Sequence, residues 1–468
     1  MCALAELMHN LGLHVSGSDT SEVFYTDSIL KELGIPYYES FEANHIASGN
    51  NAPDFIIHSA AYSINTNSEM KEAQKLGIPI LKFSDALGAY SEAFDSSAVA
   101  GVHGKTTTTA LVGTILQGVR VPAQVLVGSA VSAFGDRSTL SLGDKYFVAE
   151  TCEYKRHFLA FCPKQILITS IESDHQDYYP TYKDIFAAFL EFGRKLAPGG
   201  ELIYCADDPG ASDAALTLKK EIPGMIIVPY GFSAKGDYGI ESFAVVDERI
   251  VMKLRGFSCE LKLKIPGKHT ALNTAGAMAL VSSILKKESG NDADAGWNDE
   301  RIEGARRALE EFRGSRRRSE ILGTAGGILF MDDYGHHPTE IKTTLAGLRE
   351  FYLNRRIIVS FMSHTYTRTA SLLDEFSESL QNADIVLLHK IYSSAREQYT
   401  GGITGRTLFE KVKILNSGAG KVLYEENPLD AVDMMKGILR NKDLFITMGA
   451  GDNWVLGKKL FDFYTNQT

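Results

Sequence analysis

The residues best suited to chemistry form one glycine-, lysine- and threonine-rich cluster, Gly101-Val102-His103-Gly104-Lys105-Thr106-Thr107. A small apolar run at 97–100 precedes it, and a helix-like stretch at 110–116 follows. A strand, a tight glycine turn and a helix in this order direct backbone N–H groups and a positive helix end at a phosphate. The Lys105 amine suits the β- and γ-phosphates, and the Thr106 hydroxyl suits Mg²⁺. The cluster therefore predicts ATP binding.

The loop is shorter than the commonest phosphate-binding loop, which has a glycine five positions before Gly104, where this chain has Val99. Acidic and imidazole side chains follow two later predicted strands. Glu150 ends an apolar run at 146–150, and His175 closes the segment that follows the run at 165–171. Such residues converge where open α/β sheets place ligands, and phosphoryl transfer there requires Mg²⁺.

A third group of polar residues follows the apolar run at 328–331 and precedes a helix that Pro338 opens. It reads Asp332-Asp333-Tyr334-Gly335-His336-His337. Neighbouring histidines in an extended turn point in different directions, so a loop that faces substrate and phosphate is favoured over a metal site formed by both histidines. The basic run at 313–318 is too short for a targeting signal and fits a hinge or an anion-facing strand.

Apolar runs separated by helix-like patterns predict an α/β fold throughout the chain. The 468 residues exceed one hydrophobic core, and the pattern divides them into three domains in series. We expect a first domain at 1–94, a central ATP-binding domain at 95–311 and a third domain at 312–468. Leu-Gly-Ile-Pro occurs at 33–36 and again at 76–79, and both copies are typical of helix C-termini.

The composition of the chain argues against nucleic-acid partners and membrane segments, and it indicates the compartment. The net charge of −10 provides no cationic field for nucleic acid, so nucleic-acid partners are not expected. The five cysteines are scattered without ligand spacing, which suits a reducing compartment. No apolar run reaches the ~20 residues of a membrane helix, and no signal peptide is visible. We expect a cytoplasmic protein without a membrane segment.

Several segments together resemble one family, the Mur ligases, which are ATP-dependent amino-acid ligases of peptidoglycan precursor synthesis. The resemblance extends over nearly the whole chain. Besides the segments above, it rests on 15–19, 267–269 with Asn273, 317–318, 364–369 and 448–451. It implies three domains: an N-terminal Rossmann-like UDP domain, a central P-loop ATPase-like domain and a C-terminal Rossmann-like domain.

The resemblance also implies a reaction and its residues. ATP would phosphorylate the carboxylate of UDP-N-acetylmuramate to an acyl phosphate, which the amine of L-alanine attacks. Lys105 would hold the β- and γ-phosphates, Thr106 and Glu150 one Mg²⁺, and His175 a second. Asn273 would lie beside adenine, and Arg318 and Asp333 beside the nucleotide. The residues implied to bind the substrates are Ser18, Asp19, Ser59, Tyr334, His336, His337, His364 and Arg368. Closure of the third domain onto the second, with a hinge at 312–316, is expected.

The chain departs from the family pattern at several positions. Thr270 and Ser170 stand where asparagines are usual, and Thr365 replaces an arginine that helps to hold the amino-acid carboxylate. L-Alanine is the expected amino acid, with serine and glycine as alternatives. The family also begins with a strand and a glycine-rich turn that this chain lacks. We expect the native protein to carry a further ~15–20 residues before Met1, with a true short form as the alternative.

Three other functions stay open at this point. A related ligase could join a peptide to the same UDP-muramate, or a folate-type ligase could add glutamate. A nucleotide-binding regulatory protein without turnover is the non-enzyme alternative, because the glycine turn and the arginine at position 365 are absent.

Overall fold

The computed structural model describes residues 1–22, 25–46, 52–175, 178–288, 296–393, 401–415 and 421–466. The chain forms two compact units. Unit 1 comprises Met1–Glu241, Lys253–Glu260 and Leu272–Leu309, and unit 2 comprises Ser242–Met252, Leu261–Ala271 and Glu310–Thr468. No described helix is both long and apolar enough to cross a membrane.

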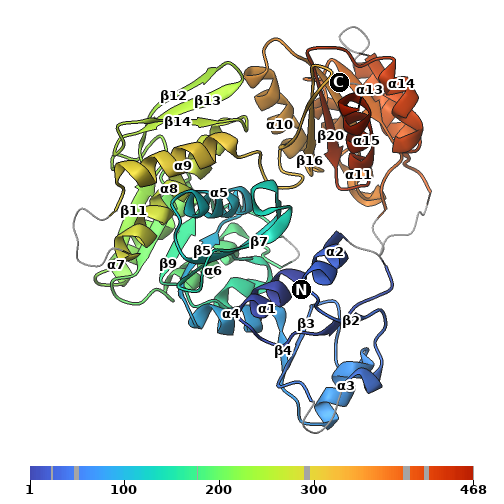
Figure 1. Ribbon diagram of the computed structural model, residues 1–468. Helices are drawn as coiled ribbons and strands as arrows, with labels where there is room; N and C mark the ends of the chain where they lie inside the picture. The colour runs from blue at the N-terminus through green and yellow to red at the C-terminus, as the bar shows by residue number, and fades with distance from the viewer. Residues whose placement is uncertain are drawn as a thin grey trace. The chain divides into compact units, whose positions relative to one another are not determined.

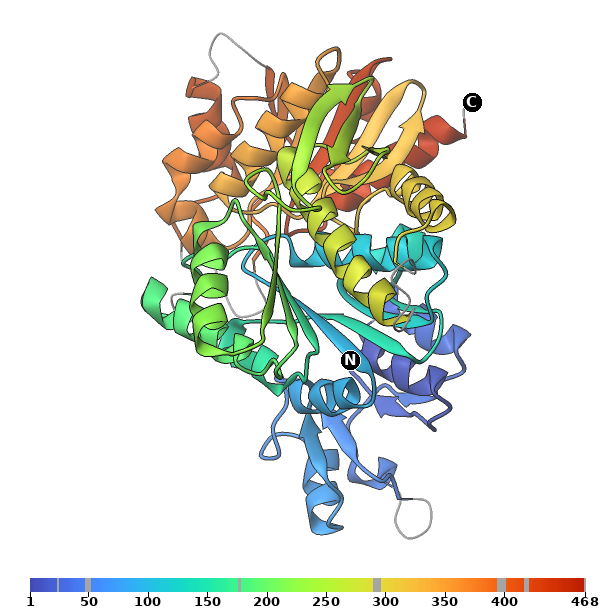
Figure 2. The ribbon, with the colours of Figure 1, turned by 90° about the vertical axis from the view of Figure 1, so that its left-hand side faces the viewer.

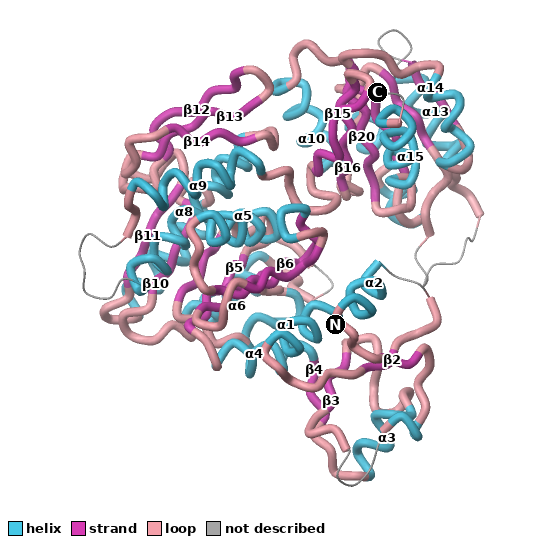
Figure 3. Tube along the Cα trace, viewed as in Figure 1, coloured by secondary structure: helices cyan, strands magenta, loops and turns pink. Residues whose placement is uncertain are grey.

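The first 94 residues of unit 1 contain short strands joined by long loops, which Figure 3 shows in pink. The helices are α1 (Cys2–Asn10), α2 (Tyr25–Glu32), α3 (Ser68–Lys75), α4 (Phe83–Glu92) and the 3₁₀ turn η1 (Ala43–His45). The strands are β1 (Gly17–Ser18), β2 (Tyr37–Tyr38), β3 (Ile56–His58) and β4 (Ile80–Lys82). Strand β1 pairs with β2 and β3 pairs with β4, both in parallel.

The two Leu-Gly-Ile-Pro segments end helices, as predicted. Gly34 follows α2 with φ +69°, and Gly77 follows α3 with φ +71°, so both adopt the left-handed conformation that favours glycine at a helix C-terminus. The strands, by contrast, are shorter than the predicted runs at 13–19 and 53–59. Each of these strands has a single partner in the described sheet, so few ladder hydrogen bonds extend it.

A seven-stranded sheet, in the order β11-β10-β9-β5-β8-β6-β7, forms the centre of unit 1. Its strands are β5 (Asp95–Ala100), β6 (Ala123–Val131), β7 (Arg137–Ser141), β8 (Tyr146–Glu150), β9 (Gln165–Ile168), β10 (Glu201–Cys205) and β11 (Ile226–Tyr230). Strand β7 is antiparallel to β6, and the other pairings are parallel. Figure 1 shows α5 (Lys105–Gly118) on one side of this sheet, with α4 and α6 (Tyr182–Gly193) on the other.

Further helices and two short 3₁₀ segments complete this part of the fold. They are α7 (Pro209–Glu221), α8 (Lys268–Glu288), α9 (Asp299–Glu311), η3 (Ser132–Phe134) and η4 (Tyr154–Ala160), with α1 packed at the β7 edge. Figure 2 shows α8 crossing in front of the central strands. A small separate sheet consists of β12 (Ile240–Val246), β13 (Arg249–Leu254) and β14 (Glu260–Leu263).

Helix α1 is packed into the core of the central sheet, which explains why residues 1–94 group with it in one compact unit. Leu4 and Leu7 are fully buried in the same cluster as Ala98 and Phe147. The buried Glu6 carboxylate accepts hydrogen bonds from Arg137 and Thr139 of β7. The domain boundaries at 94/95 and 311/312 remain predictions.

Unit 2 is built on a six-stranded sheet in the order β15-β16-β20-β17-β18-β19. The strands are β15 (Glu320–Ala325), β16 (Ile328–Asp333), β17 (Arg356–Met362), β18 (Ile385–Leu388), β19 (Lys421–Tyr424) and β20 (Asp443–Gly449). Of the described pairings in this sheet, β15 with β16 is antiparallel and the others are parallel. The helices are α10 (Pro338–Phe351), α11 (Tyr366–Ser371), α12 (Leu373–Ser379), α13 (Gly405–Leu415), α14 (Val432–Lys436), α15 (Trp454–Thr465) and η5 (Pro428–Ala431). Figure 1 shows α10 and α15 on opposite sides of the sheet.

Candidate active site

The glycine-rich loop joins the end of β5, at Ala100, to the start of α5, at Lys105. Its two glycines adopt conformations that other residues rarely take, with φ +139° at Gly101 and +83° at Gly104. A Cβ atom at Gly101 would lie 1.9 Å from the Thr169 hydroxyl oxygen. One at Gly104 would lie 2.8 Å from the side-chain oxygen of Asn273. The loop is therefore closely packed between the end of β9 and α8.

Two residues just after β9 hold the loop in place. The Ser170 hydroxyl accepts a hydrogen bond from the His103 amide at 3.0 Å, and its carbonyl accepts one from the Val102 amide, also at 3.0 Å. The Thr169 hydroxyl donates to the His103 carbonyl. Serine at position 170 thus fixes the backbone of the predicted ATP-binding residues Val102 and His103.

Lys105, at the first position of α5, directs its side chain back over the loop. Its Nζ atom donates to the carbonyl of Gly101 and, at 3.2 Å, to that of Val102. It also forms an ion pair with Oε2 of Glu153 at 3.0 Å. Glu153 is only 2% exposed, so this ion pair lies in the interior of unit 1. The predicted phosphate-binding amine is present and has a buried carboxylate as its partner.

Thr106 and Glu150 lie together, as the predicted metal site requires. The Thr106 hydroxyl donates to Oε1 of Glu150 at 2.9 Å, and the Gly128 amide donates to Oε2 at 2.6 Å. A hydroxyl and a carboxylate at a helix N-terminus are oxygen ligands of the kind that Mg²⁺ prefers. Thr107 follows in the same turn of α5. These two side chains therefore fit one Mg²⁺ ion shared with phosphate oxygens.

His175, the other predicted metal ligand, contacts a different carboxylate. Its Nε2 atom lies 3.2 Å from Oε1 of Glu153 and 3.8 Å from Oδ2 of Asp174. Among the described residues, no group of three or more His, Cys, Asp and Glu side chains is arranged around a common point.

The predicted substrate residues near the N-terminus lie at or beyond the ends of β1 and β3. The Ser18 hydroxyl donates to Glu69 at 2.6 Å, and Glu69 lies 2.8 Å from Nδ1 of His45. The Asp19 carboxylate accepts the Thr20 amide at 2.8 Å. The Ser59 hydroxyl accepts the Ala61 amide at 3.3 Å. These contacts stabilise the turns that carry the three side chains.

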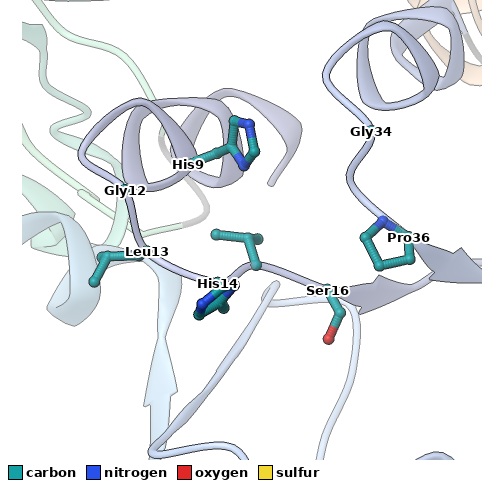
Figure 4. A pocket seen from close by; sticks show the side chains of 8 residues that line it. His9, Gly12, Leu13, His14, Ser16, Gly34 and Pro36 are labelled. Carbon is teal, nitrogen blue, oxygen red and sulfur yellow. The ribbon is translucent and has the colours of Figure 1, made fainter.

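A pocket of unit 1 lies elsewhere in the same part of the chain, beside the C-terminal end of α1 and the segment that follows α2 (Figure 4). Its lining residues are His9, Gly12, Leu13, His14, Val15, Ser16, Gly34 and Pro36. None of the predicted site residues lines it, so this pocket provides no support for the candidate site.

In unit 2, Asp333 at the end of β16 organises the turn that follows. Its carboxylate accepts the Ser319 amide and the Gly335 amide, both at 2.7 Å. Burial raises the pKa of this carboxyl, and the charge of Arg318 opposes the rise. The Arg318 guanidinium lies over the Tyr334 ring, 5.5 Å from its centroid. The structure thus brings Arg318, Asp333 and Tyr334 together.

His336, His364 and Arg368 form a second group of predicted residues in unit 2. The imidazole rings of His336 and His364 lie 5.8 Å apart, and the Tyr334 ring lies 4.9 Å from that of His336. Burial lowers the pKa of His336, and the Arg368 charge adds to this effect. Within the described part of the chain, one guanidinium nitrogen of Arg368, Nη1, is buried and has no hydrogen-bond partner. That nitrogen can donate to a carboxylate ligand.

His337 and Thr365 serve as helix caps in this unit. Nδ1 of His337 accepts the Thr339 amide at 3.3 Å, ahead of Pro338 at the start of α10. The Thr365 hydroxyl accepts the Arg368 amide at 3.4 Å at the start of α11, and Thr365 has a positive φ of 63°. Threonine at this position therefore shapes the segment that carries Arg368.

Three family models match successive parts of the chain. The Mur ligase family catalytic domain matches 1–95, the Mur ligase middle domain 99–281, and the Mur ligase glutamate ligase domain 317–451. The chain belongs to the Mur ligase family. The expected family and the three-domain α/β fold class are thereby confirmed.

Known Mur ligases resemble this one along its whole length. UDP-N-acetylmuramate–L-alanine ligase of Treponema pallidum (strain Nichols) is 49% identical over 467 residues, covering 100% of this chain and 95% of that protein. The crystal structure of UDP-N-acetylmuramate–alanine ligase from Thermotoga maritima matches with a TM-score of 0.75 at 26% identity, covering 100% of this chain and 97% of that one. A murein peptide ligase from Psychrobacter arcticus shares the fold, with a TM-score of 0.61 at 21% identity over 99% and 96% of the two chains.

Sequence reasoning missed several residues that hold the site of this Mur ligase. In the sequence, Glu153 stands out only as the outer acid of the acidic run that usually follows Glu150 in the family that the chain resembles. Nothing in the sequence singles out Thr169, or Tyr179, whose hydroxyl donates to the Glu153 carbonyl at 2.6 Å. The position of Thr169 just after β9 could have indicated its role. Because β9 pairs in parallel with β5, the segment after β9 lies beside the loop that follows β5. Glu153 follows Glu150 by three residues in an irregular segment, where spacing alone does not predict a direction for the side chain.

Proposed function

We propose that this Mur ligase joins L-alanine to the carboxylate of UDP-N-acetylmuramate at the expense of ATP, as a step of peptidoglycan precursor synthesis. The full-length similarity to a ligase of that name, at 49% identity, carries the proposal. The loop geometry supports it, because a tight glycine turn at a helix N-terminus with a lysine and a threonine suits nucleotide phosphates. ADP, phosphate and the L-alanyl product would be formed through an acyl phosphate.

In unit 1, we assign the nucleotide phosphates to the loop from Gly101 to Thr107. The Lys105 amine would stabilise the charge that develops on the transferred phosphoryl group, since a lysine donates from a compact point charge. Asn273 lies against Gly104 at the start of the helix and would contact the nucleotide from α8. Alignment and charge neutralisation, rather than a protein nucleophile, would supply most of the rate enhancement.

We assign Mg²⁺ to Thr106 and Glu150, whose side chains already lie 2.9 Å apart. When bound, the ion would neutralise phosphate charge. Glu150 is held for this role by the Gly128 amide, which fixes one of its two oxygens. His175 would assist from the Glu153 side, as the family resemblance implies for a second ion.

In unit 2, we assign recognition of the incoming amino acid to the group around Arg368. A guanidinium binds a carboxylate with two parallel hydrogen bonds, and Nη1 of Arg368 is available for one of them. His336, His337, His364 and Tyr334 would border the amino acid and the acyl group. Arg318 and Asp333 would contact the nucleotide. In unit 1, Ser18, Asp19 and Ser59 would bind the UDP-sugar.

An amino-acid panel tests the function. Phosphate release from ATP would be measured with Mg²⁺ and UDP-N-acetylmuramate, adding L-alanine, L-serine, glycine or a murein tripeptide in turn. We expect the highest kcat/KM with L-alanine. A higher value with the tripeptide would identify a peptide ligase, whose fold is shared. ATP binding without release in the presence of any acceptor would identify a regulatory protein.

We also propose a cytoplasmic location. All five cysteines, Cys2, Cys152, Cys162, Cys205 and Cys259, are free thiols in the structure. Free, scattered thiols suit a reducing compartment. Fractionation of cells, followed by detection of the protein with an antibody, would test this location.

A further inference from the structure

The ammonium group of Lys105 already has a full set of partners within unit 1. A lysine ammonium has three N–H donors and no acceptor. Three groups accept from Nζ of Lys105, namely the Gly101 carbonyl, the Val102 carbonyl and Oε1 of the Glu153 carboxylate. A phosphate oxygen can therefore bind this amine only after one of the three acceptors has been released.

The Glu153 carboxylate serves two functional groups at once. Oε1 of Glu153 accepts a hydrogen bond from Nζ of Lys105 at 3.2 Å and also lies 3.2 Å from Nε2 of His175, while Oε2 lies 3.0 Å from Nζ. The Glu153 side chain is only 3% exposed, so water does not replace a lost partner. Leaving a buried carboxylate unpaired is costly. If Lys105 turns to a phosphate, His175 still pairs with Glu153.

The backbone of Glu153 is fixed by a neighbour that also fixes His175. The Tyr179 hydroxyl donates to the Glu153 carbonyl at 2.6 Å, and the Arg156 amide donates to the same oxygen at 2.9 Å. The backbone amide of Tyr179 donates to the His175 carbonyl at 2.7 Å. Tyr179 is 3% exposed, and burial raises its pKa to about 12, so it stays a donor at neutral pH. One buried tyrosine thus ties both segments together.

We propose that Glu153 is a positioning residue of this ligase. Its buried carboxylate pairs with both Lys105 and His175. When nucleotide phosphates bind Lys105, the pair between Lys105 and Glu153 breaks, and the pair between His175 and Glu153 remains. The inference rests on the proposed function, because it assigns Glu153 a role in that same phosphoryl transfer. In this proposal Glu153 acts through the two side chains that it pairs with, and not by contacting a substrate.

Glu153→Gln tests the proposal, with Glu221→Gln as the matched control. Glu221 is an exposed carboxylate of α7 in the same unit, paired with Arg194 at 2.8 Å. Glutamine keeps the size and one acceptor oxygen but removes the charge that holds Lys105. We expect kcat to fall by about 10- to 100-fold, because groups that align a reaction contribute on this scale. The control is expected to keep the wild-type kcat.

The Kd for ADP with Mg²⁺, measured by calorimetry, distinguishes a positioning role of Glu153 from a merely structural one. Because the variant no longer has a carboxylate that competes with phosphate for Lys105, its Kd for ADP is expected to equal or fall below the wild-type value. A kcat within about threefold of wild type overturns the proposal. A Kd that rises about tenfold along with the fall in kcat also overturns it, since it indicates general loss of structure.

Two further variants address folding and coupling. If Glu153→Gln does not fold, Tyr179→Phe is tested instead, because it removes the hydrogen bond to the Glu153 carbonyl without altering the carboxylate. We then expect a smaller fall in kcat, again without a rise in the Kd for ADP. His175→Asn combined with Glu153→Gln is expected to lose little more activity than the more severe single variant, because the two residues act together. Multiplicative losses would show that Glu153 does not act through His175.

Phosphate release by the wild-type protein shows whether the proposed function itself fails, independently of the inference about Glu153. If the wild type releases no phosphate with L-alanine and UDP-N-acetylmuramate, the proposed function fails. The ADP Kd values of wild type and Glu153→Gln still test competition for Lys105 in that case. Weaker ADP binding by the variant would then overturn the inference independently.

Discussion

The Thr106 hydroxyl donates to the Glu150 carboxylate over 2.9 Å, between the first turn of α5 and the last residue of β8. The two residues are separated by 44 positions in the sequence and are brought together by the parallel pairing of β5 with β8. This pair is the part of the candidate metal site that is preformed in the protein. Its behaviour can be tested through the dependence of activity on magnesium.

Glu150→Gln is expected to raise the Mg²⁺ concentration for half-maximal activity by about tenfold or more, because an amide oxygen replaces an anionic ligand. Steady-state rates over a Mg²⁺ titration measure the change. Glu241→Gln, which alters an exposed carboxylate paired with Lys253 at 2.8 Å, is the control. An unchanged Mg²⁺ requirement in Glu150→Gln would exclude this carboxylate from the metal site.

Gly101→Ala is expected to destabilise the protein and to abolish nucleotide binding. The new methyl group would lie 1.9 Å from the Thr169 hydroxyl and 2.9 Å from the Ser170 amide nitrogen, at a φ of +139°. Overpacking of this kind costs about 1–3 kcal/mol. Thermal unfolding and ADP calorimetry measure the two effects. Gly236→Ala is the control, since no atom lies within 4 Å of its added methyl group. Equal stability of the two variants would contradict the close packing of the loop.

Arg368→Lys is expected to raise the KM for L-alanine by about 30-fold with a smaller change in kcat. Lysine keeps the charge but cannot form two parallel hydrogen bonds, and loss of a charged partner costs roughly 2 kcal/mol. Initial rates at varied L-alanine measure the shift. Arg406→Ala, at an exposed arginine stacked on Tyr424, is the control. A wild-type KM in Arg368→Lys would place the amino-acid carboxylate elsewhere.

His389 makes the stability of the protein sensitive to acid. This histidine is 2% exposed, and burial lowers its pKa from 6.5 to about 4. Between these values the unfolded chain binds a proton that the folded protein does not. The free energy of unfolding is therefore expected to fall with decreasing pH in this window, by up to about 1.4 kcal/mol per pH unit from this group. Below pH 4 both states are protonated, and the contribution no longer changes.

Urea unfolding between pH 7 and pH 4 checks this expectation, with His389→Gln as the comparison. The variant should lose the part of the pH dependence that His389 supplies. It also removes the hydrogen bonds from Ser360 at 2.9 Å and to the Glu425 carbonyl at 2.8 Å, which lowers its stability at all pH values. Parallel curves for the two proteins would show that His389 does not titrate in this range.

The central sheet could be predicted from the sequence more fully than the N-terminal strands. The runs at 146–150 and 201–205 coincide with β8 and β10, since each is a short apolar stretch with turn residues on both sides. The run at 13–19 yields only two strand residues, Gly17 and Ser18. Strand length there depends on pairing between distant segments, which a local pattern does not contain.

The candidate site could be predicted only in part for the same reason. The loop from Gly101 to Thr107 carries a local signature, and Glu150 marks a strand end. Glu153 lies ahead of two consecutive residues with positive φ, Lys155 and Arg156. No residue preference predicts that turn, so the direction of the Glu153 side chain emerges only from the folded structure.

The Lys105 ammonium of the loop is already paired with an anion of the protein, the Glu153 carboxylate. The proposed nucleotide binding there would exchange one anion at Lys105 for another, rather than capture an anion at an unpaired lysine. Because one ion pair is broken as another forms, ionic strength has a smaller net effect at this lysine than at an unpaired one. A small anion such as free phosphate gains little by displacing a carboxylate held at 3.0 Å. The Glu153 carboxylate would therefore compete for Lys105 with abundant small oxyanions as well as with nucleotide phosphates.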